Sequence, residues 1–197
     1  DGLQNWLSSM SGSSAVLLGI ILGLMMCFDL GGPVNKAAYL FATAGLSTGD
    51  ESSMQIMAAV MASGMVAPIA LSLATFIRKS LFTPAEQENG KSAWLLGLSF
   101  VSEGAIPFAA ADPFRVIPSM MAGGAVTGAV SMALSVGSRA PHGGVFVLFA
   151  IEPKIGWLIS IIAGVIVSAA AVVLLKMVWP QKIVEKQAEA AKAEAHA

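Results

Sequence analysis

Charged residues are scarce in this sequence. Lys, Arg, Asp and Glu make up 12% of the 197 residues, hydrophobic residues make up 56%, and the mean hydropathy is +0.76. Soluble domains average about 25% charged residues. The shortage of charge excludes an ordinary soluble domain. The net charge of -1, without a basic cluster, gives no support to nucleic-acid binding.

Cysteine and histidine are also rare. A single cysteine, Cys27, excludes an internal disulfide framework. The two histidines have no cysteine or carboxylate at metal-ligand spacing, and the sequence has no P-loop, no Ser-His-Asp-like arrangement and no TVGYG-like filter. We therefore expect neither a metal ion nor a cofactor.

Long apolar runs are what the sequence has in abundance. Residues 52–77, 116–138 and 155–175 each lack an ionisable side chain, and roughly 20 apolar helical residues cross the bilayer core of about 30 Å. Residues 14–28 form a shorter run, and residues 34–47 a marginal one that is tilted or only partly inserted. The sequence therefore predicts an all-α polytopic membrane protein with about five transmembrane helices.

Glycine is abundant as well, with 20 residues. Small residues four apart let membrane helices approach closely. Three such pairs are present: Gly19/Gly23, Gly124/Gly128 and Ala125/Ala129. They predict close helix–helix contacts, although such spacings also arise by chance.

Two apolar segments, 92–113 and 137–153, are interrupted by Gly, Pro and charge. Basic residues flank the cytoplasmic ends of spans, which places both the polar loop 78–91 and the C-terminus on the cytoplasmic side. This requires an even number of crossings between them. We therefore expect the two interrupted segments to be re-entrant hairpins from opposite sides, a design that builds midplane sites in transporters.

The chain has no basic n-region of a signal peptide and does not begin with Met. We expect it to be a piece of a longer polypeptide. Residues 1–180 are assigned to one membrane-embedded domain, and residues 181–197, rich in Ala, Glu and Lys, to a polar cytoplasmic tail.

Glu103 is the strongest candidate for a functional residue. It lies within an apolar stretch, where an ionised carboxylate is costly and usually functional. Pro107 lacks an N–H, so in a regular helix the carbonyl of Glu103 would lose its partner and face a ligand together with the carboxylate. The alternative is that Glu103 pairs with a buried Arg and only holds a hairpin together.

His142 is the second candidate, at the expected tip of the second hairpin. Gly143 and Gly144 follow it and allow a ligand to approach the backbone closely, and neutral imidazole can donate to or accept from a hydroxyl. The alternative is an exposed loop histidine.

The segment 29–36 joins the first two apolar runs. Its Gly-Gly-Pro is turn chemistry, while Asp29, Asn35 and Lys36 are polar groups at a membrane face that either shape the turn or contact a ligand. Further along, Asp112 is expected to cap the helix that starts at Pro113.

Four segments together resemble the membrane-embedded enzyme IIC domain of fructose-type phosphotransferase-system (PTS) permeases, and specifically its C-terminal part. In chain order they are FDLGGPVNKAAYLF (28–41), SEGAIPF (102–108), DPFRVIP (112–118) and APHGGVFV (140–147). The resemblance extends over residues 12–180. It implies a permease of the bacterial inner membrane that imports fructose, or a close analogue, and phosphorylates it.

The resemblance also implies partners and roles. The phosphoryl group would come from a phosphocysteine on enzyme IIB, supplied through IIA and HPr, and a homodimer in lipid is expected. In related IIC domains a Glu of a Pro-bearing hairpin motif and a His elsewhere bind the sugar, which matches Glu103 and, more loosely, His142. Arg115 and Arg139 are candidates for IIB docking or phosphate contact.

Two other functions remain open at this point. An ion-coupled secondary transporter can use the same hairpin design, but it would need an ion gradient and release its substrate unmodified. A non-transporting membrane subunit would use Glu103 and Arg139 only as a structural pair.

Overall fold

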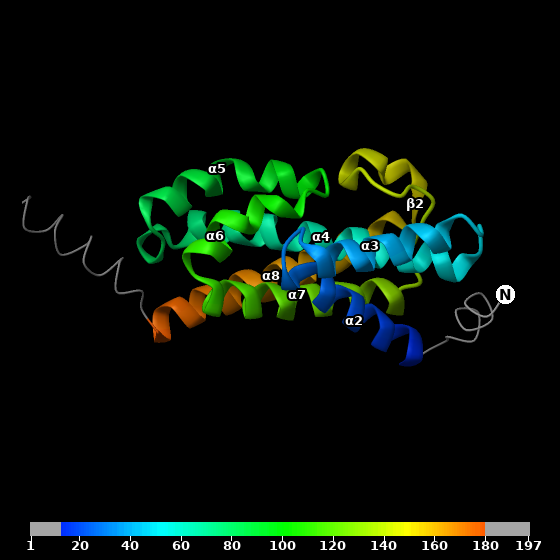
Figure 1. Ribbon diagram of the computed structural model, residues 1–197, viewed down its shortest axis with the longest axis horizontal. Coiled ribbons are helices and arrows are strands. Elements are labelled where there is room, and N and C mark those ends of the chain that lie inside the picture. The colour runs from blue at the N-terminus through cyan, green and yellow to red at the C-terminus, as the bar shows by residue number, and fades with distance from the viewer. Residues whose placement is uncertain (1–12, 180–197) are drawn as a thin grey trace, which may run out of the picture.

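The computed structural model describes residues 13–179, so the predicted polar tail 181–197 lies outside the described part of the chain. Three long helices, α4 (Glu51–Ile77), α7 (Pro113–Ala133) and α8 (Lys154–Val178), form its scaffold (Figure 1). Within the described residues, these three alone are long and apolar enough to cross a membrane. They coincide with the three longest predicted spans.

α4 is the centre of the bundle. Its most apolar window is 89% buried, against 50% for α7 and 39% for α8. Asp50 caps its start through a hydrogen bond from the Ser53 N–H. A helix without an ionisable residue between positions 52 and 77 can be enclosed in this way because its burial removes no charged side chain from water.

The two shorter predicted spans form a hairpin that turns back inside the bundle. They are α2 (Ser13–Phe28) and α3 (Pro33–Leu46). The Cys27 thiol donates to the carbonyl of Ser63, near the middle of α4. With 14 residues α3 is about 21 Å long, short of the roughly 30 Å hydrocarbon core. With 16 and 14 residues, α2 and α3 are both shorter than the three long helices, so the structure supports three of the five predicted spans.

The interrupted segment 92–113 does form a hairpin. After η1 (Lys79–Leu81), helix α5 (Pro84–Leu98) runs inward and the chain returns through η2 (Ser102–Ala105) and α6 (Ile106–Ala111). The first part of α5 corrects the prediction of a loop over 78–91. Thr83 and Glu86 form a capping box that starts a helix within this polar stretch.

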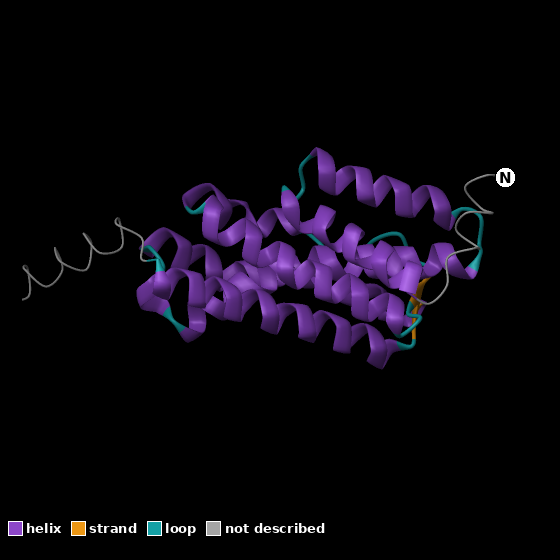
Figure 2. Cartoon of the chain, turned by 90° about the horizontal axis from the view of Figure 1, so that it is seen from below, coloured by secondary structure: helices purple, strands orange, loops and turns teal. Residues whose placement is uncertain are grey.

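The second interrupted segment is a shorter hairpin. Strands β1 (Gly137–Ser138) and β2 (Ile151–Glu152) pair antiparallel at its base, and η3 (Gly144–Ala150) forms its returning leg. In the described part of the chain, this ladder, orange in Figure 2, is the only exception to an all-helical fold.

The two hairpins enter from opposite ends of the bundle and meet tip to tip (Figure 1). The backbone contact is tight: a Cβ atom on Gly144 would lie 2.1 Å from the carbonyl oxygen of Leu98. We call the end where α8 finishes the Lys176 end, and the opposite end, where α8 begins, the Arg139 end. The 78–83 connection and the last described residues both lie at the Lys176 end. This agrees with the prediction that the loop after residue 77 and the end of the chain lie on the same side.

Close glycine contacts join α2 to α7, which confirms the prediction from small-residue spacing. A Cβ atom on Gly19 would lie 2.3 Å from the carbonyl oxygen of Gly128, and one on Gly23 would lie 2.0 Å from that of Gly124. The two backbones touch, so neither pair tolerates a side chain.

Candidate functional site

A cavity of about 450 Å³ lies where the three chain reversals meet, a size typical of small-molecule sites. Its position is halfway along α4, because the Ser102 hydroxyl beside it donates to the Gly64 carbonyl at 2.8 Å. Nine residues line it: Gly31, Asn35, Lys36, Tyr39, Phe100, Val101, Ser102, Glu103 and His142. Among the ligand-contact candidates from the sequence, this cavity gathers Glu103, His142, Asn35 and Lys36, but not Asp29 or Gly143.

Glu103 lines the cavity from the first turn of η2 with an exposed side chain. In the part of the chain that the structure describes, no Lys or Arg lies within ion-pair distance of it, so the alternative of a buried Arg partner finds no support. The Glu103 carbonyl was expected to be free, but it is not. The chain forms a 3₁₀ turn here, and the N–H of Ile106 donates to this carbonyl. The carboxylate is thus the group of Glu103 that can accept a hydrogen bond at the cavity.

His142 lines the same cavity from the opposite hairpin, within an aromatic group that the sequence pattern did not indicate. The ring centroids of His142 and Phe100 lie 4.9 Å apart, and Tyr39 lies 6.2 Å from His142 in an edge-on arrangement. Tyr39 is the only tyrosine of the chain. Aromatic residues in apolar runs are usually core residues, so nothing in the sequence alone singled out these two rings.

Asp29 and Asn35 have different surroundings. The Asp29 carboxylate accepts the backbone N–H groups of Val34 at 2.7 Å and Asn35 at 2.9 Å, so it caps the start of α3 and does not line the cavity. The buried Asn35 side chain donates to the carbonyl of Met26 at 2.7 Å and keeps its amide oxygen as an acceptor. Segment 29–36 was expected either to shape the turn or to contact a ligand. Asp29 shapes the turn, whereas Asn35 and Lys36 line the cavity.

Gly143 adopts a φ of +122°, a left-handed conformation that suits glycine and turns the chain directly after His142. It lies beside the cavity without lining it. A side chain on Gly143 would meet Val147 at 2.7 Å, so the residue shapes the tip that carries His142.

Arg115 and Arg139, the two candidates for IIB docking, lie at opposite ends of α7. Arg115 is buried at the Lys176 end, where its Nε donates to Asp112 at 2.8 Å, its Nη1 donates to the Trp179 carbonyl and its guanidinium lies over the Trp179 ring. Asp112 precedes α7 as predicted, but its side chain binds Arg115 instead of capping the helix. A single docking surface therefore cannot include both Arg115 and Arg139.

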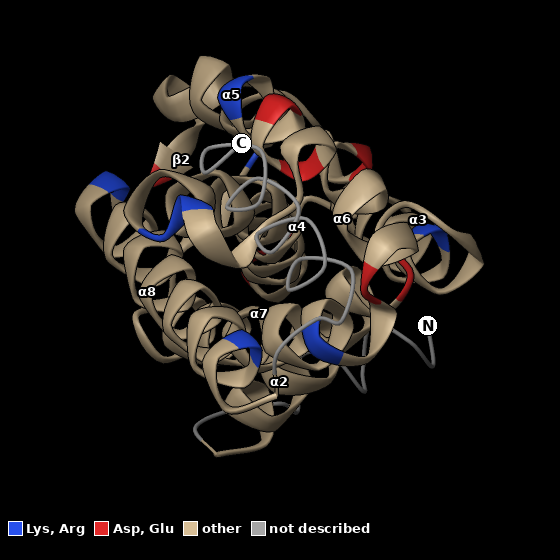
Figure 3. Cartoon of the chain, turned by 90° about the vertical axis from the view of Figure 1, so that its left-hand side faces the viewer, with Lys and Arg blue, Asp and Glu red and all other residues tan. Residues whose placement is uncertain are grey.

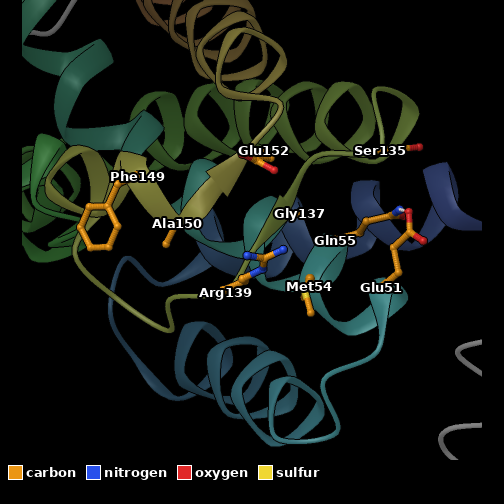
Figure 4. A pocket seen from close by; sticks show the side chains of 9 residues that line it. All are labelled: Glu51, Met54, Gln55, Ser135, Gly137, Arg139, Phe149, Ala150 and Glu152. Carbon is orange, nitrogen blue, oxygen red and sulfur yellow. Dashed lines mark hydrogen bonds between the residues drawn. The ribbon is translucent and has the colours of Figure 1, made fainter.

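Arg139 lines a second, smaller pocket of about 160 Å³ at the Arg139 end. Figure 4 shows the Arg139 side chain near Glu152 of β2 and Met54 of α4; Glu51 and Gln55 also line this pocket. In the described part of the chain Arg139 makes no side-chain ion pair with either glutamate. This pocket is separate from the cavity of Glu103 and His142.

The main cavity suits a small, hydroxyl-rich ligand. It offers a carboxylate acceptor, the Lys36 ammonium as a donor, an imidazole that can donate or accept, an amide oxygen and aromatic rings. The described residues include no cluster of His, Cys, Asp or Glu that could hold a metal ion.

No protein-family model and no solved structure matches the chain. Curated relatives do. The chain is 55% identical over 179 residues to the PTS system fructose-specific EIIB'BC component of Escherichia coli (strain K12), covering 89% of this chain and 31% of that protein. It is 47% identical over 189 residues to the PTS system fructose-specific EIIC component of Haloferax volcanii, covering 95% and 50%.

The fructose permease IIC component of Bacillus amyloliquefaciens is 45% identical over 174 residues, covering 88% of this chain and 56% of that protein. The chain thus spans about a third of the multi-component relative and about half of the two single-component ones. Over 88–95% of its length the chain is thus similar to part of proteins named as fructose-specific PTS components or a fructose permease IIC component.

Proposed function

We propose that the chain forms the sugar-binding part of a PTS permease that imports fructose, or a close analogue, and phosphorylates it on the way. The observation that carries the proposal is the convergence of Glu103, His142 and Asn35 on one cavity halfway along α4. The names of the relatives support fructose as the substrate. The full-length protein, of which this chain is one part, would act as a sugar phosphotransferase with enzymes IIB and IIA.

In this proposal the cavity orients one sugar hydroxyl for phosphoryl transfer. Phosphoryl transfer passes through a loose transition state, so positioning and charge stabilisation do most of the catalysis. The Glu103 carboxylate accepts a hydrogen bond from the reacting hydroxyl. As the S–P bond of the IIB phosphocysteine breaks and the new O–P bond forms, Glu103 takes the hydroxyl proton.

The other cavity residues hold the sugar during this step. His142 and the amide oxygen of Asn35 bind further hydroxyls, while Phe100 and Tyr39 contact the apolar faces of the sugar ring. The transferred group leaves IIB as a phosphoryl group, and the thiolate that remains on IIB is rephosphorylated through IIA.

The proposal also assigns sides of the membrane. α4, α7 and α8 cross it, and the α5–α6 and 137–153 hairpins are re-entrant from opposite faces. The exposed Arg78 and Lys79 flank α4 at the Lys176 end, which the positive-inside rule makes cytoplasmic. The sugar would then enter from the Arg139 end, and IIB would dock at the Lys176 end, to which Arg115 belongs and Arg139 does not. We further expect the full protein to be a homodimer.

Sugar phosphorylation by inverted membrane vesicles tests this function. Vesicles with the full-length parent protein receive phosphoenolpyruvate, the soluble PTS proteins and labelled fructose. We expect fructose phosphate to form only with phosphoenolpyruvate present, and an ionophore to have no effect. Uptake of unmodified fructose that stops with the ionophore would instead establish an ion-coupled transporter.

A further inference from the structure

Four charged side chains form a buried cluster at the Lys176 end, the end from which Figure 3 views the molecule. Glu86 and Lys176 are each 1% exposed, Asp112 is 3% and Arg115 is 9% exposed. Lys176 Nζ lies 3.3 Å from Glu86 Oε1 and 2.9 Å from Asp112 Oδ2, and Arg115 holds the other oxygen of Asp112. Two acidic and two basic groups therefore balance within one enclosed cluster.

Lys176 joins both legs of the α5–α6 hairpin at their base. Glu86 belongs to the first turn of α5, and Asp112 directly follows the last residue of α6. The Lys176 ammonium also lies 4.6 Å from the centre of the Phe82 ring, just before α5. One cation from α8 thus fixes the points where this hairpin leaves and rejoins the scaffold.

The remaining contact of α5 with the scaffold is made by small residues. Besides Glu86, its buried face consists of Gly90, Ala93 and Gly97. A Cβ atom on Gly90 would lie 2.2 Å from Thr75 Oγ1, and one on Gly97 would lie 2.6 Å from Ile69 Cγ1. Thr75 and Ile69 of α4 occupy the space that these glycines leave, so the contact is close but involves no charged group. The ion pairs at the base of the hairpin add charged contacts of defined geometry to this packing.

Stability alone does not account for this cluster. Replacing a buried ion pair by apolar residues of similar volume is often neutral or stabilising, because taking charges out of water is costly. Ion pairs with short distances do require an exact geometry of the three elements that contribute to them. A role in positioning fits this requirement better than a role in stability.

We propose that Lys176 is a positioning residue, which sets the depth at which the α5–α6 hairpin presents Glu103 to the sugar. The inference rests on the function proposed above. Lys176 touches neither the cavity nor the sugar, and it acts through Glu86, Asp112 and the rigid α5 helix. Its loss displaces Glu103 at the tip, which weakens the hydrogen bond that Glu103 accepts from the sugar and so raises KM; the same displacement can also lower the rate by up to roughly 100-fold.

Steady-state phosphorylation kinetics of the full-length protein in vesicles tests the proposal. The main variant is Lys176→Met combined with Glu86→Gln, which leaves the Asp112–Arg115 pair intact and no buried charge unpaired. The control is Lys91→Met combined with Glu88→Gln, which removes an exposed ion pair from α5, the helix that also carries Glu86. We expect the KM for fructose to rise about tenfold in the first double variant and to stay at the parent value in the control.

A KM readout separates positioning from folding, because a smaller amount of folded protein lowers Vmax and leaves KM unchanged. Lys176→Arg keeps the charge and should restore KM to within about threefold of the parent, since Arg can pair with both carboxylates. An unchanged KM in the Lys176→Met, Glu86→Gln variant would overturn the proposal.

A second readout does not depend on catalysis. Spin labels on Ser99 at the hairpin tip and Ser47 at the Arg139 end are placed in the full-length protein freed of other cysteines. Their distance distribution should broaden or shift in the Lys176→Met, Glu86→Gln variant and match the parent in the Lys91 control. A distribution unchanged in both overturns the positioning role, whereas a parent that phosphorylates no sugar contradicts only the proposed function.

Discussion

Gly31 lies directly against the carboxylate of Glu103: a Cβ atom on Gly31 would be 2.8 Å from Glu103 Oε1. The two residues are 72 positions apart in the chain, on the turn between α2 and α3 and on the tip of the α5–α6 hairpin. The contact shows how two chain reversals build one wall of the cavity.

Gly31→Ala should therefore damage the site. Gly31 has a φ of +108°, so alanine strains the backbone by about 1–2 kcal/mol and also pushes the Glu103 carboxylate aside. We expect kcat/KM for sugar phosphorylation to fall at least about tenfold. Gly49→Ala is the matched control, because Gly49 has a φ of +73° but no atom within 4 Å of its Cβ position. Equal losses of kcat/KM in both variants would show that backbone strain, and not the contact with Glu103, causes the effect.

Gly124→Val tests the contact between α2 and α7. A Cβ atom on Gly124 would lie 2.5 Å from the Gly23 carbonyl oxygen and 2.6 Å from Cys27 Sγ. Overpacking of this kind costs about 1–3 kcal/mol, so the melting temperature in detergent should fall. The control Ala122→Val places the same side chain on an exposed face of α7. If both variants melt with the parent, α2 does not pack against α7 as described.

Asp50 at the start of α4 predicts a pH dependence. Hydrogen bonds from the side chains of Thr48 and Ser53 lower the pKa of the Asp50 carboxyl below its usual value. A lowered pKa in the folded state contributes stability above the unfolded pKa of about 3.9, and this contribution is lost as the pH falls through the folded-state pKa. The parent should therefore melt above Asp50→Asn at pH 7, and the difference should shrink below about pH 4. A constant difference at both pH values would show that ionisation of Asp50 has no part in it.

Much of the site could be predicted from the sequence, because it lies where the apolar pattern is interrupted. Glu103 and His142 were recognisable as polar residues next to Gly and Pro in otherwise apolar segments, and the structure brings both to one cavity. Phe100 and Tyr39 were not, since an aromatic ring in an apolar run looks the same whether it packs in a core or faces a ligand.

The errors also have physical causes. Lys176 follows the usual pattern of a basic residue at the cytoplasmic end of a span, but its burial depends on Glu86 and Asp112, 90 and 64 positions away. The polar residues 84–91 suggested a loop, although the Thr83–Glu86 capping box was readable in the sequence. For α3, hydropathy alone left open whether the segment is tilted or only partly inserted.

The central claim is that the Glu103 carboxylate binds the sugar and takes the proton of the reacting hydroxyl. Its most direct test is the initial rate of fructose phosphorylation by Glu103→Gln, per folded protein, in vesicles with phosphoenolpyruvate and the soluble PTS proteins. Glu88→Gln, on the exposed face of α5, is the control. We predict a rate at least about 100-fold below the parent for Glu103→Gln and a parental rate for Glu88→Gln. A Glu103→Gln variant that phosphorylates fructose as fast as the parent would contradict the claim.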